Sequence, residues 1–269
     1  SNRLASYTEK STRYQTWDVD AFYIPAEFQD AKTRDQYLQT CTTLFVTYQA
    51  SLERVNQLVL SGDALPGESQ NQKERRARLS AIDACRFLLP ASSLANVGMT
   101  INARALEHAI GKMLSSPLQE ARDTGAEIRA AASASTPTLL KYANEIPYLE
   151  SVRQEFSSSQ DPLEDQSEDW CRLVHWDADA LYRVAAAALY REQSIDYTQA
   201  LAQAKSASED DLARQMRCLL STPDTHTIPS RELESAVFTF DLLIDQGAYF
   251  EVKRHRMMTQ TPQRLTASH

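Results

Sequence analysis

A long amphipathic stripe between Thr33 and Ser61 constrains the fold of this chain more than any other feature. Apolar side chains recur there at alternating spacings of three and four residues, which places them on one face of a helix: Leu38, Cys41, Phe45, Tyr48, Leu52, Val55 and Val59. Gly62 follows this stripe, and glycine is common just past a helix end. The sequence therefore predicts one long helix whose apolar face packs in a core or against another subunit.

Shorter segments extend this helix-rich pattern. Further helices are expected at residues 73–89, 102–114, 118–133, 137–144, 178–192, 197–204, 209–220 and 247–256. Strands are expected only at residues 171–176 and 235–243. Many helices with few strands indicate an α+β fold, in which a small mixed or antiparallel sheet packs with long helices.

The composition changes sharply between residues 157 and 168, where Ser, Gln, Asp, Glu and Pro replace most apolar residues. Such a segment has too little apolar surface to form part of a packed core. We therefore expect a linker at residues 157–169, which divides the chain into segments 1–156 and 170–269.

Charge and apolar content exclude several classes of protein. The formal net charge of -8 argues against a general nucleic-acid binder, which would carry a basic domain or stripe. No apolar run approaches the roughly 20 residues of a membrane span, and no cleavable leader opens the sequence, so we expect a cytoplasmic protein with no membrane partner. The four cysteines are far apart, with no C-x-x-C pair, so we expect no metal site. Cys41 and Cys85 fall on apolar helix faces and are expected to be core thiols.

Two incomplete motifs lie near the two ends of the sequence. One is Arg254-His255-Arg256, and the other is the run RLASYTEKSTRY at residues 3–14. Together they resemble the signature of flavin-dependent thymidylate synthases, in which R-H-R is followed by an N-E dipeptide and then by S-x-R-Y. Each copy here keeps a different half of that signature.

Other short motifs follow the order found in the same family. Segment 170–269 resembles the N-terminal half of its fold, with an H-x-x-P loop at residues 226–229, an F-T-F strand at 238–240 and then R-H-R. Segment 1–156 resembles the C-terminal half, with F-Y-I-P at 22–25, R-x-x-L-P at 86–90, N-A-R at 102–104 and E-I-R at 127–129. The chain thus resembles the second half of one module joined to the first half of the next.

The resemblance implies a reaction, its cofactors and an assembly. Family members convert dUMP to dTMP by reductive methylation, using FAD with NADPH and methylenetetrahydrofolate as cosubstrates. Their sites are shared between subunits of a tetramer, so a homo-oligomer, either a tetramer or a pseudo-tetramer of modules, is implied. Arginine suits such a site because its planar, permanently charged guanidinium binds phosphate and carbonyl oxygens.

Matching the family motifs residue by residue implies two sets of contacts. The flavin would contact Arg254, His255, Arg256, His226, Glu9, Asn102, Arg104 and His108, with Ile228 in the loop against it. The nucleotide, dUMP or a relative of it, would contact Glu9, Ser11, Arg13, Arg86 and Glu251. Structural alternatives remain for three of these sites: R-H-R as charge at a helix C-terminus, His108 as an ordinary exposed helix residue, and Arg86 as a surface ion pair.

Several positions depart from the family pattern. In the copy at residues 3–14, Thr8 replaces the signature asparagine. In the copy that begins at Arg254, Pro262 stands where the glutamate should be. Met113 occupies the place of an arginine that orients the uracil, so no catalytic residue is assigned, because methionine cannot make those hydrogen bonds. Glu251 replaces a glutamine that reads the base, and a carboxylate there would repel a carbonyl or phosphate oxygen.

These departures leave alternatives to an active thymidylate synthase. One is a divergent paralogue that keeps the fold, with or without FAD binding, but acts on another nucleotide or serves as a non-catalytic subunit. Another is a purely helical interaction module, which the long stripe at residues 38–59 alone supports and which leaves the ordered motifs unexplained.

Overall fold

The computed structural model describes residues 4–10, 17–157, 169–221, 224 and 226–263. Contacts divide the chain into two compact units, and each is described here by itself. Unit 1 comprises Ser1–Leu163 with Asp245–His269, and unit 2 comprises Glu164–Ile244. This division reflects packing alone, and the assignment of residues 1–156 and 170–269 to two family modules stays a prediction.

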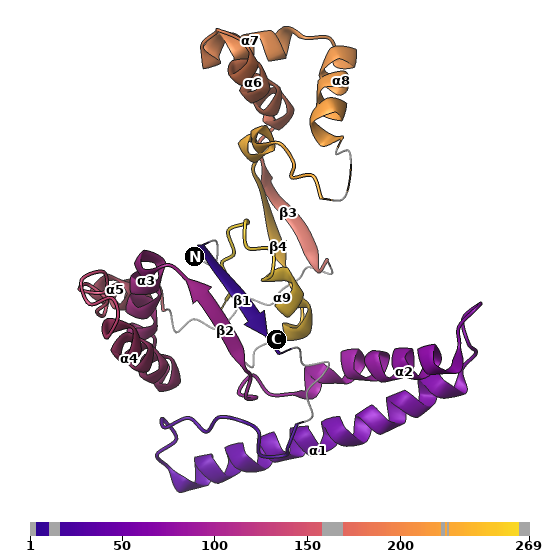
Figure 1. The fold of residues 1–269 in the computed structure, drawn as a ribbon, viewed down its shortest axis with the longest axis vertical. Coiled ribbons are helices and arrows are strands. Elements are labelled where there is room, and N and C mark those ends of the chain that lie inside the picture. The colour runs from indigo at the N-terminus through magenta and orange to yellow at the C-terminus, as the bar shows by residue number, and fades with distance from the viewer. Residues whose placement is uncertain (1–3, 11–16, 158–168, 222–223, 225, 264–269) are drawn as a thin grey trace. The chain divides into compact units, whose positions relative to one another are not determined.

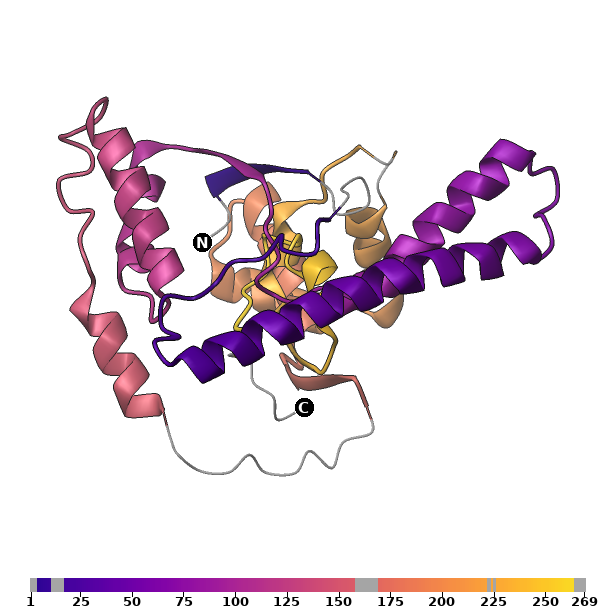
Figure 2. The same ribbon diagram turned by 90° about the horizontal axis from the view of Figure 1, so that it is seen from below.

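A helical hairpin forms one part of unit 1. Helix α1 (Ala31–Ser61) and helix α2 (Gln70–Cys85) run side by side, as both views show (Figures 1 and 2). Asp30 starts α1 by accepting a hydrogen bond of 2.7 Å from the Thr33 amide. Ser69 and Gln72 form a capping box that starts α2. The long helix expected from the apolar stripe is confirmed, whereas the second helix ends earlier than expected and continues as a short 3-10 turn, η3 (Arg86–Leu88).

The apolar stripe of α1 builds the first core of unit 1. Phe45 is fully buried, and its ring centroid lies 6.2 Å from that of Trp17 and 5.9 Å from that of Phe22. Cys41 and Cys85 are buried in the same cluster, which confirms both as core thiols. The stripe is therefore used largely within the chain, where it holds α1 against α2 and the segment around Phe22.

We expect the Glu68–Arg76 pair beside the hairpin loop to make the stability of unit 1 sensitive to acid. Arg76 donates from Nε and Nη2 to the two carboxylate oxygens at 2.7 and 2.8 Å, and the Leu65 amide donates at 2.9 Å. The bonds from Arg76, followed by that from Leu65, lower the pKa of Glu68 from 4.5 to about 2. Because the folded pKa lies below the unfolded one, the stabilisation is present above pH 4.5 and is lost as the pH falls towards 2.

Thermal unfolding of the wild type and of Glu68→Gln across this pH range measures the effect. The wild type should melt higher near neutral pH, and the difference should vanish as the pH approaches 2. Glu53→Gln is the matched control, because Glu53 also lies in the hairpin but accepts from Gln57 and not from an arginine. A pH-independent gap between the wild type and Glu68→Gln would contradict this account.

The remainder of unit 1 combines a two-stranded ribbon with shorter helices. Strands β1 (Ala5–Glu9) and β2 (Val97–Ile101) pair antiparallel, with Ala5 opposite Ile101 and Glu9 opposite Val97. The helices are α3 (Ala103–Leu114), α4 (Gln119–Ser133), α5 (Pro147–Phe156) and α9 (Gln246–Val252). The ribbon and α5 were not expected from the sequence. The helix expected at residues 137–144 is wrong: that segment forms turns that bury Leu140 and Ala143 against Ile110.

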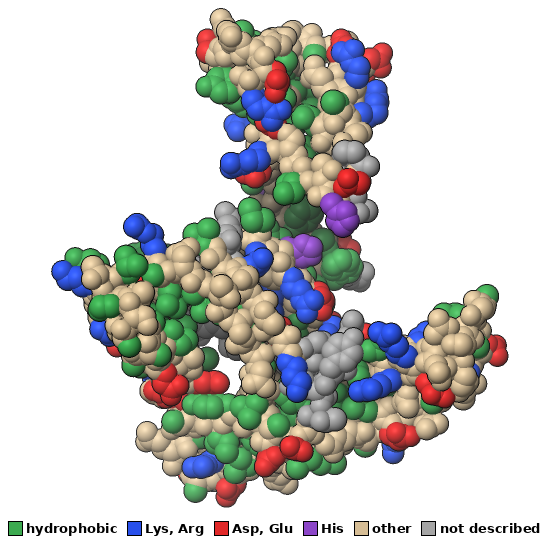
Figure 3. All heavy atoms as spheres, viewed as in Figure 1, with side chains coloured by type: hydrophobic (Ala, Val, Ile, Leu, Met, Phe, Trp, Pro, Cys, Tyr) green, Lys and Arg blue, Asp and Glu red, His purple; other side chains and the backbone are tan. Residues whose placement is uncertain are grey.

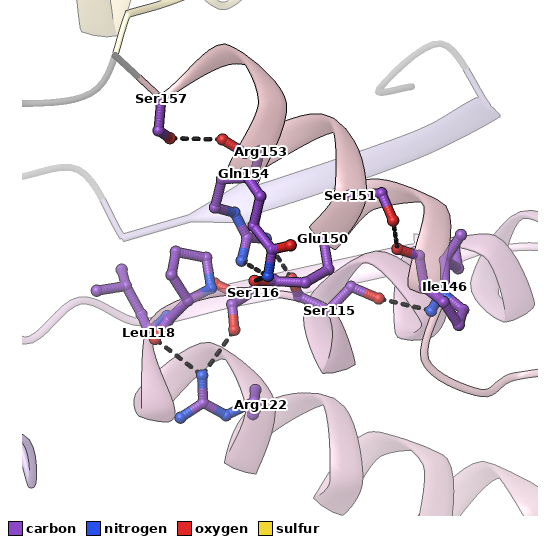
Figure 4. A network of polar contacts seen from close by, with 12 residues as sticks. Ser115, Ser116, Leu118, Arg122, Ile146, Glu150, Ser151, Arg153, Gln154 and Ser157 are labelled. Carbon is purple, nitrogen blue, oxygen red and sulfur yellow. Dashed lines mark hydrogen bonds and ion pairs between the residues drawn. The ribbon is translucent and has the colours of Figure 1, made fainter. Parts of the chain in front are cut away.

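Two arginines close the C-terminal end of α3 (Figure 4). Arg122 donates to the carbonyl oxygens of Ser116 and Pro117 at 2.7 and 2.8 Å, and Arg153 donates to that of Ser115 at 2.5 Å. The Ile146 amide donates to the Ser115 hydroxyl at 2.7 Å. Carbonyl groups that a helix end leaves without partners are therefore satisfied by guanidinium groups from α4 and α5.

Unit 2 joins a second ribbon to a small helical cluster. Strands β3 (Cys171–Trp176) and β4 (Phe238–Leu242) pair antiparallel, with an irregularity between Leu173 and His175. The other elements are α6 (Ala180–Glu192), α7 (Tyr197–Ser206), α8 (Glu209–Leu220) and the 3-10 turn η4 (Arg231–Ser235). Buried Glu232 ties η4 to α6 by accepting from Arg191 at 2.5 Å.

The architecture confirms the expected class, a helix-rich α+β fold with small antiparallel sheets. On the face that Figure 3 shows, basic and acidic side chains are interspersed, with apolar side chains between them. Among the helices of the described residues, none combines the length and apolar content needed to cross a membrane. The expected linker falls mostly outside the described residues.

Candidate functional site

The start of α9 packs directly on the 3-10 turn η3. A β-carbon added to Gly247 would lie 1.7 Å from Cε1 of Phe87, so the aromatic ring rests against the glycine backbone. Asp245 fixes this end of the helix by accepting from the Ala248 amide at 2.9 Å. The close approach brings two segments far apart in the sequence, residues 86–88 and 246–252, into one place in unit 1.

Three charged side chains meet at this junction, and we call them the Arg86–Glu251–Arg254 cluster. Glu251 Oε1 lies 3.8 Å from Arg86 Nη1, and Glu251 Oε2 lies 3.4 Å from Arg254 Nη1. The Arg86 side chain is 16% exposed, against 50% for Glu251 and 65% for Arg254. Arg86 and Glu251, both predicted nucleotide contacts, thus lie together, and Arg254, a predicted flavin contact, lies beside them.

Arg86 has unused hydrogen-bonding capacity. Its Nε atom is buried and has no hydrogen-bond partner among the described residues, and its other neighbour, Asp83, is 4.0 Å away from Nη1. A buried donor without a partner is uncommon in folded proteins, since it loses its bond to water and gains nothing in return. The alternative of an ion pair is met in part, since Arg86 lies within 4.0 Å of both Asp83 and Glu251, although its side chain is only 16% exposed.

A helix was expected over residues 247–256, and this is wrong at its end: α9 stops at Val252, and the R-H-R segment follows it as a turn. Gln260 holds this turn by donating at 3.1 Å to the carbonyl oxygens of both Val252 and His255. Residues 254–258 line an open depression of about 520 Å³. Arg256 donates to the carbonyl oxygen of Ala5, which joins the R-H-R turn to strand β1.

The strand that Arg256 contacts, β1, belongs to the signature copy at residues 3–14. Glu9 ends this strand and is exposed. Ser11 and Arg13, the other predicted nucleotide contacts of this copy, lie outside the described residues. Arg256 therefore contacts the strand that carries Glu9. A site built from the R-H-R turn together with Glu9, Ser11 and Arg13 stays a prediction.

Helix α3 carries the second predicted flavin element. Asn102 caps the helix by accepting from the Ala105 amide at 2.9 Å, which leaves its amide N–H groups available. Arg104 and His108 are four residues apart on one exposed face of α3. Partial burial and then the charge of Lys112 lower the pKa of His108, so it is expected to be neutral at pH 7 and to offer one donor and one acceptor.

Met113, at the position of the missing arginine, takes part in helix packing. A β-carbon added to Gly125 of α4 would lie 2.9 Å from the Met113 β-carbon, so the two helices approach closely there. The half-buried thioether has no group that could donate a hydrogen bond to a uracil carbonyl.

The H-x-x-P loop lies in unit 2. Asp224 organises it by accepting from the amides of His226 and Thr227 at 2.7 and 2.9 Å. The bond from His226, the largest cause, lowers the pKa of Asp224, so this carboxylate stays charged at neutral pH. Ile228 is 88% exposed, as a residue that contacts a ligand or another surface would be.

Phe87, Gly247 and Gln260 shape the junction, yet sequence reasoning did not single them out. Phe87 could have been noticed as an aromatic residue next to a candidate arginine, and Gly247 as a glycine at a helix start. Nothing in the sequence pairs the two, because their contact joins distant segments.

A comparison with protein families finds a match over the first half of the chain. The family model described as thymidylate synthase complementing protein matches residues 1–141. This segment includes the first signature copy and the elements around Arg86, Asn102 and Arg104.

Curated relatives extend the similarity to nearly the whole chain. A UPF0159 protein of Chlamydia muridarum is 28% identical over 283 residues, covering 96% of this chain and 52% of the relative. A UPF0159 protein of Thermoplasma acidophilum is 23% identical and covers 98% of this chain and 59% of the relative. A flavin-dependent thymidylate synthase of Clostridium tetani is 25% identical over 144 residues, covering 53% of this chain and 55% of the relative. The chain thus spans about half the length of the curated relatives that it matches.

Proposed function

Because the chain belongs to the thymidylate synthase complementing protein family, we propose that it acts as an FAD-dependent thymidylate synthase. The proposed reaction is the reductive methylation of dUMP to dTMP, with methylenetetrahydrofolate and NADPH as cosubstrates. The Clostridium tetani relative carries the name of that activity. The observation that carries the proposal for this chain is the Arg86–Glu251–Arg254 cluster, in which predicted ligand contacts from two distant segments lie within 4 Å of one another.

The residues present fit a flavin nucleotide. Arg254 is largely exposed beside an open depression, and Arg104 is exposed on α3, so both guanidinium groups are accessible to a pyrophosphate. Asn102 has amide donors left after capping its helix. When bound and reduced by NADPH, FAD would supply the hydride, and the chain's own residues would bind and orient the two nucleotides.

The proposed assembly is a homo-oligomer, a tetramer or a pseudo-tetramer of modules. Glu9, Ser11, Arg13 and the R-H-R turn keep complementary halves of one signature, so a site can be completed by a second module or copy. His226, in the H-x-x-P loop of unit 2, would contribute to the flavin site of such an assembly.

A second candidate function is that of a divergent paralogue that binds FAD without making dTMP. Met113 favours it, because this side chain is packed against α4 and cannot polarise a uracil carbonyl. Binding of FAD and dUMP without turnover would identify this candidate.

Absorbance spectroscopy tests the proposal. The purified chain should take up FAD and become yellow, and oxidation of the reduced flavin should depend on dUMP and methylenetetrahydrofolate together. Arg254→Met should weaken FAD uptake, while Arg231→Met, which removes an exposed arginine from unit 2, should not. A chain that remains colourless after incubation with excess FAD and removal of the free flavin would exclude the proposed function.

A further inference from the structure

Strands β3 and β4 of unit 2 form a ribbon whose two faces differ in polarity (Figure 1). Residues that pair across two strands share a face, so the register sorts the side chains. One face, which we call the apolar ribbon face, carries Cys171, Leu173, Trp176, Phe238, Phe240 and Leu242. The opposite face is polar and carries Arg172, His175, Thr239 and Asp241. There Arg172 donates to Asp241 at 2.7 Å.

An irregularity in β3 brings Trp176 to the apolar ribbon face. The register skips Val174, which lies between Leu173 and His175. With strict alternation, Trp176 would lie on the polar face. The skipped residue thus adds a tryptophan to a face that already has two phenylalanines.

The helices of unit 2 do not cover the apolar ribbon face. Helices α6, α7 and α8 build their own core around Val184, Ala200 and Met216, and that core includes no described residue of β3 or β4. The leucine and aromatic side chains of the face are 38% to 55% exposed. Contiguous apolar patches mark sites of interaction, because leaving them in water costs free energy.

The chemistry of the face favours a second copy of this chain as its partner. Its large side chains are leucines and aromatic residues, so the face offers no ion pair that would select a different protein. Sheet faces pack on one another about 10 Å apart with interdigitated side chains. Two identical faces related by a twofold axis can match in this way, and each copy then covers the patch of the other.

The face is large enough for an interface of moderate strength. An aromatic side chain has about 150–250 Å² of surface, so the three half-exposed rings offer about 300 Å² per copy and about 600 Å² in a dimer. The two leucines, Cys171 and the strand backbone add to this area. The sum approaches the roughly 1,000–1,200 Å² at which specific interfaces begin. We therefore expect a dissociation constant in the micromolar range.

We propose that the apolar ribbon face is a homodimer interface, in which β3 and β4 of one copy stack on β3 and β4 of a second copy. Phe240 lies at the middle of β4 opposite Leu173, and aromatic residues at the centre of an interface contribute most to binding. This inference names a surface for the homo-oligomer of the proposed function, and it rests on that proposal only for the identity of the partner. It requires neither bound FAD nor turnover.

Alkylation of cysteines in the full wild-type chain, read by mass spectrometry of the labelled peptides, tests this inference. Cys171 is half-buried on the apolar ribbon face, and Cys218 is exposed on α8 and serves as the internal reference. A second copy should cover Cys171, so its labelling rate should fall at least about threefold between about 1 and 100 µM chain. The rate at Cys218 should stay constant. Coverage by another part of the same chain would instead protect Cys171 equally at every concentration.

The variant Phe240→Glu places a carboxylate at the centre of the face. Burying that charge without a partner is costly, so the dissociation constant from sedimentation equilibrium should rise at least about 30-fold. The concentration dependence of Cys171 labelling should largely disappear with it. Thr239→Glu is the matched control, because the neighbouring Thr239 is exposed on the polar face. This control should associate like the wild type, and circular dichroism checks that both variants are folded.

The outcomes separate this inference from the proposed function. A wild-type Cys171 that is labelled at the same rate at every concentration, whether fast or slow, would overturn the interface without reference to any variant. Protection of Cys171 in Phe240→Glu, or its loss in Thr239→Glu, would also overturn it, because association would then not depend on the apolar ribbon face. FAD uptake is read separately from absorbance, and a colourless chain with concentration-dependent labelling would contradict the proposed function alone.

Discussion

Replacing Phe45 by alanine is expected to lower the free energy of unfolding by about 3–5 kcal/mol, the usual cost of removing a buried aromatic ring. Phe45 is fully buried on α1 and lies between the rings of Trp17 and Phe22. The loss combines the transfer of the ring to water with the cavity left behind, since neighbouring aromatic rings can close that space only partly.

Chemical denaturation followed by tryptophan fluorescence measures this effect. Trp17 is buried next to Phe45, whereas Trp170 and Trp176 are largely exposed in unit 2, so the shift of the emission on unfolding reports mainly on the α1 core. Phe156→Ala is the control, because that side chain is 81% exposed and its loss should change stability by no more than about 0.5 kcal/mol. If the two variants unfold alike, the aromatic cluster does not hold unit 1 together.

The helices that sequence reasoning located best are those with a strong local signal. Helix α1 begins within two residues of the predicted start, and α8 has the predicted bounds, Glu209–Leu220. Both have apolar residues at helical spacing, and a side-chain cap at Asp30 or Ser208 marks where each begins. Information of this kind lies within one segment, so a single sequence is sufficient to read it.

The ribbon of β1 and β2 was missed because it depends on a distant partner. Ala5 pairs with Ile101, and neither five-residue strand has enough alternating apolar residues to be recognised alone. The error at residues 137–144 has a related cause. Leu140 and Ala143 are apolar because they fill a core beside Ile110, and turns bury them as well as a helix would. The proline that opens α5, Pro147, was a usable signal, since proline is favoured in the first turn of a helix.

The candidate site also depends on contacts between distant segments, which the sequence alone did not predict. Motif order singled out Arg86, Glu251 and Arg254 separately, and the structure brings them together. Their approach depends on Phe87 resting against Gly247, a contact that none of the motifs specifies. The sequence-based interpretation of Glu251 as repulsive considered this residue without its neighbours, and the flanking arginines change the expected electrostatics.

Replacing Gly247 by alanine is expected to disrupt this junction. Alanine favours a helix over glycine by about 1 kcal/mol, so α9 considered alone should gain stability. The added β-carbon would lie 1.7 Å from the Phe87 ring, however, and overpacking of this kind costs about 1–3 kcal/mol. The steric cost exceeds the gain in helix propensity. Either the Phe87 ring must therefore leave the contact, or α9 must move away from η3. Movement of α9 away from η3 separates Arg86 from Glu251, and the affinity for dUMP should then fall about 10-fold or more.

A double-mutant cycle with Phe87→Ala tests this explanation. Removing the ring opens space for the new methyl group, so Gly247→Ala combined with Phe87→Ala should bind dUMP more tightly than Gly247→Ala alone. Gly62→Ala is the matched control, since it also places a methyl group at a helix end but meets only a backbone oxygen at 3.5 Å. Circular dichroism of each variant separates a local rearrangement from general unfolding. If Gly247→Ala binds and melts like the wild type, Phe87 does not set the position of α9. If it loses affinity and Phe87→Ala fails to restore any, the loss arises elsewhere in the helix.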